Sequence, residues 1–584
     1  MTTPEKLLIE RLAPAFARVA GTPADPTIRP SRHADFQCDG ALALGRRLGR
    51  DAREIAAEVL RYAALDDLCS AAEISGPGFV NLTLAPTALG RSLAGIAADE
   101  RLGVPRTDRP ETIVVDYSGP NTAKEMHVGH LRSTIIGDAA VRVLEWQGHT
   151  VLRRNHLGDW GTPFGMLIEH LLDIGETEAA HELSVGDLTG FYQAARRAFD
   201  ADEEFRVRSR ERVVALQAGD PTTLRLWRVL VTESKKYFMA VYARLGVRLT
   251  ADDFVGESRY NDRLAPLVAE LAELGLLRES AGAQCVFPAG FVNRDGEPLP
   301  LIVRKSDGGF GYAATDLATL RHRLQDLAAD RLLYVVGTPQ SGHLEMVFTT
   351  GRDAGWHDAT ARDADRPSAP ARIEHVEFGY VLGSDGKILR TRAGASIKLV
   401  DLLDEAVSRA AATIAEKNPD LDADARAAVA RAVGIGAVKY ADLSGDRRKD
   451  YRFDYDRMLS FDGNTAPYLQ YAHARARSIL RRAGAEAPRA TGPLVIGEPA
   501  ERALALRLLA FPDVIAEVGE SLDFHRLALH LFELATTVTG FYENCPVLRS
   551  TGEIRHSRLI LCDLTARTLA RGLDLLGIEA PERM

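Results

Sequence analysis

Asp116-Tyr-Ser-Gly-Pro-Asn-Thr-Ala-Lys-Glu-Met-His-Val-Gly-His130 is the stretch of sequence from which the fold of this chain can be inferred. Its first residues complete a short β-branched run, 112–117, which predicts a buried strand. Ser-Gly-Pro-Asn at 118–121 cannot continue a strand and predicts a turn. Apolar residues at helical spacing then predict a helix from about 128 to 147, and a further strand is expected at 150–155. This succession of strand, glycine-containing turn, helix and strand indicates a βαβ unit of a parallel sheet.

The second half of such a sheet is expected further along the chain. Strand signals recur at 331–336 and 373–381, and a helix between them is expected to start near Gly342. The chain between the two halves is mostly helical and charged at 176–270, and then has the pattern of a small β region at 283–303. We therefore expect a split nucleotide-binding fold with an inserted subdomain.

The two ends of the chain have different patterns. Residues 3–20 predict an amphipathic helix, for which Thr2 and Glu5 offer a capping box. Mixed helix and strand signals follow, and the proline-containing stretch 105–110 is the expected first domain boundary. From about 396 onward the pattern is helical almost to the end.

The composition is that of a large globular protein. The 584 residues suggest about four domains, and 46% hydrophobic with 26% charged residues exclude a disordered, collagen-like or coiled-coil chain. The net charge of −9 argues only weakly against a nucleic-acid partner, because local patches decide such binding. No signal peptide and no membrane span are expected, so a cytoplasmic location is favoured. The cysteine spacing predicts neither disulfides nor a metal site; the five are Cys38, Cys69, Cys285, Cys545 and Cys562.

His127 and His130 are the candidate catalytic residues of the opening stretch. At a spacing of i and i+3 they lie one above the other at a helix start, where free N–H groups and a partial positive charge favour phosphates. Imidazoles can donate to phosphoryl oxygens, and Gly129 leaves room for a flat base. Two alternatives remain open for such a pair, namely histidines without a special role and metal ligands. The βαβ context favours the phosphate interpretation over both.

The same stretch carries a family resemblance. His127-Val-Gly-His130 resembles the HIGH signature of class I aminoacyl-tRNA synthetases. The wider sequence is similar to arginyl-tRNA synthetases of the bacterial type, and the match runs from the N-terminal region to the last residue. The segments that carry it are 118–133, Asn155-His-Leu-Gly-Asp-Trp-Gly161, Lys439-Tyr-Ala-Asp-Leu443, Asn464-Thr-Ala-Pro-Tyr-Leu-Gln-Tyr471 and Leu576-Gly-Ile-Glu579.

The resemblance implies a multidomain α/β and all-α fold. A Rossmann-type class I catalytic core would be flanked by an α/β N-terminal domain and a helical anticodon-binding domain. The expected ranges are 1–107 for a domain that binds the tRNA elbow and D-loop, 108–395 for the catalytic domain with an insertion at about 176–303, 396–450 for a helical connection and 451–584 for the anticodon-binding domain.

The second class I signature, KMSKS, is degenerate here. Its place is taken by Gly383-Ser-Asp-Gly-Lys-Ile-Leu-Arg-Thr-Arg-Ala-Gly394, which lacks the second lysine. In the family a lysine just before the HIGH motif is thought to compensate, and Lys124 stands there. Lys124, Lys387 and Arg392 are therefore candidate catalytic cations, since the leaving pyrophosphate needs a mobile cation. The alternative for Lys124 is a solvated surface lysine.

The candidate arginine pocket contains carboxylates and an aromatic side chain, as a planar guanidinium requires. Asp116 ends the first strand, where open α/β sheets bind ligands. Tyr312 and Asp316 are four residues apart and point the same way on a helical turn; a helix N-cap is the alternative for Asp316. The resemblance implies that these three residues, Asn121 and Gln340 contact the arginine.

A basic stretch at 468–489 is the candidate tRNA-binding surface. It contains Arg475, Arg477 and Arg481 and opens with two tyrosines. Basic residues can hold phosphates while aromatic rings stack on splayed bases. A solvated helix face is the alternative, and the resemblance places the anticodon-binding domain here.

The expected function is ATP-dependent ligation of L-arginine to the 3′ end of tRNA(Arg) through an arginyl-adenylate. His127, Gly129, His130 and Lys387 would contact ATP, Mg²⁺ would arrive with ATP, and the enzyme is expected to be a monomer without a tightly bound cofactor. Two alternatives are a paralogue that loads arginine for small-molecule biosynthesis and a non-catalytic tRNA-binding protein.

Overall fold

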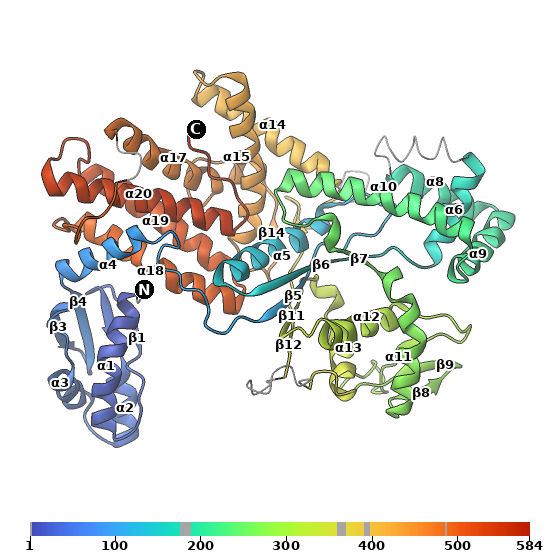
Figure 1. Ribbon diagram of the computed structural model, residues 1–584, viewed down its shortest axis with the longest axis horizontal. Coiled ribbons are helices and arrows are strands. Elements are labelled where there is room, and N and C mark those ends of the chain that lie inside the picture. Colours follow the sequence, from blue (N-terminus) through green and yellow to red (C-terminus); the bar gives the residue numbers. More distant parts are fainter. Residues whose placement is uncertain (1–2, 176–187, 359–369, 391–396, 485–487) are drawn as a thin grey trace.

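The computed structural model describes residues 3–175, 188–358, 370–390, 397–484 and 488–584 (Figure 1). Its central feature is a five-stranded parallel sheet in the order β12-β11-β5-β6-β7. The strands are β5 (Thr112–Asp116), β6 (Thr150–Leu157), β7 (Phe254–Gly256), β11 (Arg331–Tyr334) and β12 (Arg372–His375). Strand order reverses between β5 and β11, so the carboxyl ends of these two strands form the switch point at which open α/β sheets bind ligands.

The predicted βαβ unit is confirmed. Helix α5 (Val128–Gln147) joins β5 to β6 and ends at Gly148, whose φ of 98° lies in the left-handed region that suits glycine. Apolar and small side chains are buried nearly all round this helix, because it packs on β5 and β6 and also on helices of the C-terminal half. The helix that carries the histidines at its start is thus held from every side.

The segment between the two halves of the sheet differs from the sequence prediction in one respect. Helix α6 (Thr162–Ile174) precedes the predicted stretch, whose helical character is confirmed in the described residues by α8 (Leu188–Ala201), α9 (Glu203–Gln217) and α10 (Pro221–Leu245). The prediction of a mostly helical stretch as far as 270 is confirmed, but the short strand β7 interrupts it, returns to the central sheet and pairs with β6 before helix resumes at Asn261. Three buried residues are too short a run to show a strand by periodicity.

A second excursion follows β7. It contains the short 3₁₀ segment η2 (Glu257–Tyr260), helix α11 (Asn261–Glu273) and a three-stranded antiparallel sheet, which confirms the predicted small β region. The strands are β8 (Leu277–Ser280), β9 (Ala283–Val286) and β10 (Leu301–Arg304). Helix α12 (Tyr312–Arg321) continues into a π-helical turn, η3 (His322–Asp326), and leads to β11.

The second half of the sheet is confirmed with one correction. Helix α13 (Ser341–Asp353) begins one residue before the predicted Gly342, after the 3₁₀ turn η4 (Thr338–Gln340). The strand expected at 373–381 is split, because β12 ends at His375 and β13 (Val381–Leu382) pairs instead with β14 (Tyr451–Arg452). Gly379 makes this departure possible, since a Cβ there would lie 2.5 Å from the Asp450 carboxylate and 2.7 Å from the Lys449 backbone.

The N-terminal part is an α/β unit. Helix α1 (Pro4–Ala20) is capped by Thr3, whose hydroxyl accepts from the Lys6 N–H, rather than by the expected Thr2, which lies outside the described residues. A four-stranded antiparallel sheet has the order β1-β2-β4-β3. The elements are β1 (Ile28–Pro30), β2 (Phe36–Cys38), α2 (Gly40–Leu48), α3 (Ala52–Tyr62), β3 (Cys69–Ser75) and β4 (Phe79–Leu84).

The C-terminal part is helical, as predicted, except for β14. Its helices are α14 (Leu399–Lys417), α15 (Ala423–Leu443), α16 (Tyr455–Met458), α17 (Ala466–Ala483), α18 (Pro499–Ser521), α19 (His525–Asn544) and α20 (Gly552–Leu575). Helix α4 (Pro86–Ala98), which follows the N-terminal sheet, lies against α18 (Figure 1). Within the described ranges, no helix combines the length and apolar character needed to cross a bilayer.

Candidate active site

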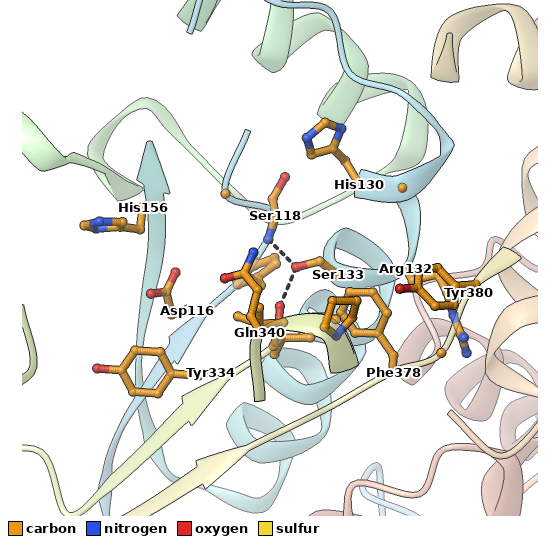
Figure 2. A pocket seen from close by; sticks show the side chains of 18 of the residues that line it. Asp116, Ser118, His130, Arg132, Ser133, His156, Tyr334, Gln340, Phe378 and Tyr380 are labelled. Atoms are coloured by element: carbon orange, nitrogen blue, oxygen red, sulfur yellow. Dashed lines mark hydrogen bonds between the residues drawn. The ribbon is translucent and has the colours of Figure 1, made fainter. Parts of the chain in front are cut away.

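A cavity of about 520 Å³ opens at the carboxyl ends of β5 and β11 (Figure 2). His156, Asp116 and Tyr334 lie at one side of it, and Arg132, Phe378 and Tyr380 lie at the other (Figure 2). The predicted site residues that line the cavity are Asp116, Asn121, His127, Gly129, His130, Asp316 and Gln340. The fold therefore brings together residues from β5, α5, α12 and the turn before α13.

The two histidines cap their own helix. The Nδ1 of His127 accepts from the Gly129 N–H at 3.0 Å, and the Nδ1 of His130 accepts from the His127 N–H at 3.1 Å. Burial lowers the pKa of both rings, with a smaller contribution from the charge of Lys124, and the pKa of His130 falls to about 3. Both rings are therefore neutral with the proton on Nε2, so each presents an N–H donor rather than an acceptor.

Gly129 has a local reason to be glycine. A Cβ at this position would lie 2.8 Å from Cε1 and 2.9 Å from Nδ1 of His127. Glycine at this position therefore leaves the space that the capping imidazole of His127 occupies. The prediction that Gly129 also leaves room for a base stays a prediction.

The carboxylate of Asp116 is paired inside the protein. The guanidinium of Arg323 lies 2.7 Å from Asp116 Oδ2, and the side chains of Arg323 and Asp116 are 1% and 13% exposed. Arg323 also lies over the ring of Tyr334 at 5.0 Å, and Tyr334 is the strand neighbour of Asp116 in β11. Sequence analysis missed Arg323, because the contact joins the end of a strand to a turn far along the chain.

Tyr312 and Asp316 meet at a common neighbour, His343. The Nε2 of His343 donates to Asp316 Oδ2 at 2.7 Å, and the rings of His343 and Tyr312 are 4.9 Å apart. The prediction that the two α12 residues point the same way is confirmed. Tyr312 is 69% exposed and does not line the cavity, although Asp316 one helical turn away does.

Glu257 is a further acidic residue that the sequence did not single out. It lies in η2, and burial raises the pKa of its carboxyl to about 7, with the charges of Asp316 and Asp159 acting in the same direction. A carboxyl group with a pKa near 7 beside a second carboxylate is characteristic of a functional site. The only sequence signal was its place just after the short strand β7.

The two candidate cations that fall within the described residues, Lys124 and Lys387, lie outside the lining of the cavity. The ammonium of Lys124 lies 4.2 Å from the ring centroid of Tyr192 in α8. Lys387 is exposed in a tight loop whose Gly383 N–H donates to the Lys387 carbonyl, and the next residue, Ile388, does line the cavity. Arg392 lies outside the described residues.

The far wall of the cavity is tied to the helical half of the chain. Arg132, in the first turns of α5, places its Nε 3.2 and 3.1 Å from the two carboxylate oxygens of Asp442 in α15. Both side chains are almost fully buried, and Arg132 lies over the rings of Phe378 and Tyr451. The wall that carries Phe378 and Tyr380 is thus anchored to the same helix that carries the histidines.

The three candidate tRNA-binding arginines lie on α17, and two of them share a neighbour. Arg475 is exposed, with its guanidinium 4.9 Å from the ring centroid of Tyr542. Arg477 pairs with Glu582 at 2.7 Å, and Arg481 donates to the Glu582 carbonyl at 3.1 Å. Two of the three are therefore occupied by the C-terminal segment in this structure.

A parallel sheet of this order, with two helix-capping histidines at its switch point, defines the catalytic core of a class I aminoacyl-tRNA synthetase. The sequence model described as tRNA synthetases class I (R), catalytic domain, matches residues 93–455. The models for the arginyl-tRNA synthetase N-terminal domain and the DALR anticodon-binding domain match 5–84 and 469–584. The chain belongs to the arginyl-tRNA synthetase family, which confirms the resemblance and the fold class inferred from the sequence.

Individual relatives agree over the whole length. The chain is 54% identical to an arginine–tRNA ligase of Thermobifida fusca, with 100% of both chains covered, and 51% identical to one of Frankia casuarinae, with 99% and 97% covered. Among solved structures, arginyl-tRNA synthetases of Plasmodium falciparum and Thermus thermophilus superpose with TM-scores of 0.81 and 0.79 at 28% and 27% identity. The comparison with the Plasmodium protein covers 100% of each chain, and the comparison with the Thermus protein covers 99% of this chain and 100% of the Thermus chain.

Proposed function

We propose that this protein ligates L-arginine to the 3′ end of tRNA(Arg), with ATP as the energy source and arginyl-adenylate as the intermediate. The observation that carries the proposal is the pair of neutral imidazoles at the start of α5, which present Nε2–H donors beside a pocket lined by carboxylates. Membership of the family and the whole-length relatives support the same activity.

The first step joins arginine to AMP. An oxygen of the arginine carboxylate attacks the α-phosphorus of ATP, the bond to the bridging oxygen breaks, and pyrophosphate leaves. His127 and His130 donate to the phosphoryl oxygens as negative charge builds on them, and the N-terminus of α5 adds its partial positive charge. Lys124 and Lys387 stabilise the departing pyrophosphate, and Arg392 is the third candidate cation for this step.

The pocket recognises arginine by charge and shape. Asp316 and Tyr312 form the end that takes the guanidinium, while Asp116, Asn121 and Gln340 orient the rest of the amino acid. A buried carboxylate that lacks its cation is costly, so an uncharged analogue is rejected. The base and ribose of ATP then lie toward Phe378 and Tyr380, on the opposite side of the cavity.

The second step transfers the arginyl group to a terminal ribose hydroxyl of tRNA, with AMP as the leaving group. Arg475, Arg477 and Arg481 bind the anticodon arm, and the N-terminal unit binds the tRNA elbow. Mg²⁺ enters with ATP. Because the cavity carboxylates Asp116 and Asp316 are already paired with Arg323 and His343, the phosphates of ATP are the principal ligands of the Mg²⁺ ion. We infer a cytoplasmic, monomeric enzyme.

The decisive experiment is ATP–pyrophosphate exchange with each amino acid in turn, with and without purified tRNA(Arg). Exchange that only arginine supports, together with arginylation of the tRNA, is the expected result. Exchange with no amino acid but intact tRNA binding would identify a non-catalytic tRNA-binding protein. Transfer of arginine from the charged tRNA to a small acceptor would identify a biosynthetic paralogue. His130→Gln is the matched variant, because it removes the Nε2 donor of the capping ring.

A further inference from the structure

Arg323 stands directly behind the cavity and faces one of its carboxylates. It belongs to η3, the π-helical turn that extends α12, and Asp316 and Thr319 precede it at helical spacings of seven and four residues. Asp316 and Thr319 line the cavity, so Arg323 continues the same face of this segment inward. Its guanidinium reaches Asp116 Oδ2 at the end of β5.

The contact has the properties of a dedicated ion pair. Arg323 is 1% exposed, and Asp116 is its only carboxylate at ion-pair distance among the residues that the structure describes. Burial disfavours the charge of Arg323, but the Asp116 carboxylate favours it, and the pKa of the guanidinium lies above its ordinary value. A buried cation in contact with a carboxylate restricts the position of that carboxylate, because leaving either charge unpaired inside the protein is costly.

We propose that Arg323 is a positioning residue for arginine recognition, which holds the Asp116 carboxylate in place and neutralises it. The substrate carries the same guanidinium group as Arg323, and a carboxylate with one oxygen already paired to Arg323 cannot offer both oxygens to the substrate. Arg323 therefore leaves Asp316 as the carboxylate for the substrate guanidinium and leaves the free oxygen of Asp116 for another substrate donor. Because Arg323 and Asp316 lie on one continuous helical segment, the pair also sets the spacing between the two acids.

The test uses the full-length enzyme with tRNA(Arg) and separates arginine binding from the rest of catalysis. Arg323→Met is expected to raise KM for arginine at least about tenfold while KM for ATP stays within about twofold. Arg323→Lys, which keeps the positive charge in a smaller head group, should recover part of the loss. In an Asp116→Asn background the effect of Arg323→Met should shrink, since the two residues act as one unit. Arg321→Ala is the control, because this arginine of the same helix is partly exposed and pairs with Glu270 at 2.7 Å.

The inference rests on the proposed role of Asp116, and the variants distinguish the two failures. If Asp116→Asn raises KM for arginine and both Arg323 variants leave it unchanged, the role of Arg323 is overturned while the proposed function stands. If Asp116→Asn leaves KM for arginine unchanged, the assignment of Asp116 itself is wrong. If KM for arginine and KM for ATP rise by the same factor in the Arg323 variants and the melting temperature falls, Arg323 is a purely structural residue. Should Arg323→Met fail to fold, the same comparison is made with Arg323→Lys.

Discussion

The ammonium of Lys124 lies 4.2 Å from the ring centroid of Tyr192, so a candidate catalytic cation contacts helix α8 of the inserted segment. The neighbouring residues are tied to the same segment, since the Ala123 N–H donates to Ser234 Oγ at 2.8 Å and the Glu125 N–H to Thr189 Oγ1 at 3.4 Å. A movement of α8 or α10 would therefore displace the loop that leads to the candidate catalytic residues His127 and His130.

This arrangement predicts a large effect of Lys124 on arginine activation. Lys124→Ala should lower ATP–pyrophosphate exchange at least about 100-fold, or about 2.7 kcal/mol of transition-state stabilisation, with little change in substrate binding. Tyr192→Leu should have a smaller effect in the same direction, because it removes the aromatic face, and Tyr192→Phe should be close to wild type. Near-normal exchange in Lys124→Ala would assign the cation to Lys387 or Arg392.

Substrate selection should depend on Asp316. The wild-type enzyme should prefer arginine over citrulline and lysine by at least about 10³-fold in kcat/KM, since citrulline lacks the charge and lysine lacks the fork. Asp316→Asn should lose most of the preference over citrulline, because an amide does not require a cation. Competition charging on purified tRNA measures both ratios. A variant that loses activity with arginine but keeps its full preference over citrulline would show that Asp316 is structural.

Glu257 should make arginine binding depend on pH near neutrality. Its pKa is raised to about 7, so the carboxyl is largely neutral below that pH and anionic above it, and only the anion attracts the substrate cation. For the free enzyme, kcat/KM for arginine should therefore rise as the pH increases through about 7. Glu257→Gln should raise KM for arginine and remove this limb of the profile. An unchanged limb in the variant would place the titrating group elsewhere.

The helix α17 offers an internal comparison for tRNA binding. The triple variant with alanine at Arg475, Arg477 and Arg481 should weaken tRNA binding. The slope of log K against log salt concentration should become less steep by about 0.7 to 0.9 for each phosphate that the protein no longer neutralises. Arg475→Ala should account for more of this than Arg477→Ala, because Arg477 is already paired with Glu582. The slope of log K against log salt is the measurement, with KM for arginine as the control. An unchanged slope in the triple variant would make this a plain solvated helix face.

The sequence predictions that the structure confirms concern residues that lie close together in the chain. The strand at 112–117 and the helix from 128 follow from residues whose burial repeats within the element itself, and β5 and α5 match them within a residue. The i, i+3 pair of His127 and His130 is likewise a local relation, and it became a reciprocal cap. The stretch expected as one strand at 373–381 failed for the opposite reason, because β13 is defined by its partner β14 rather than by its own pattern.

The sequence by itself determined the class of fold, the family and the end of the sheet at which the site lies, because these depend on periodicity, turn chemistry and motif order. Only the tertiary structure decided which charges meet there. Asp116 faces Arg323, Glu257 lies near Asp316, and Lys124 rests on Tyr192. Each of these contacts joins residues that are far apart in the sequence and meet only in the folded chain. Side-chain charge is visible in a sequence, but its counter-ion and its burial are properties of the folded interior.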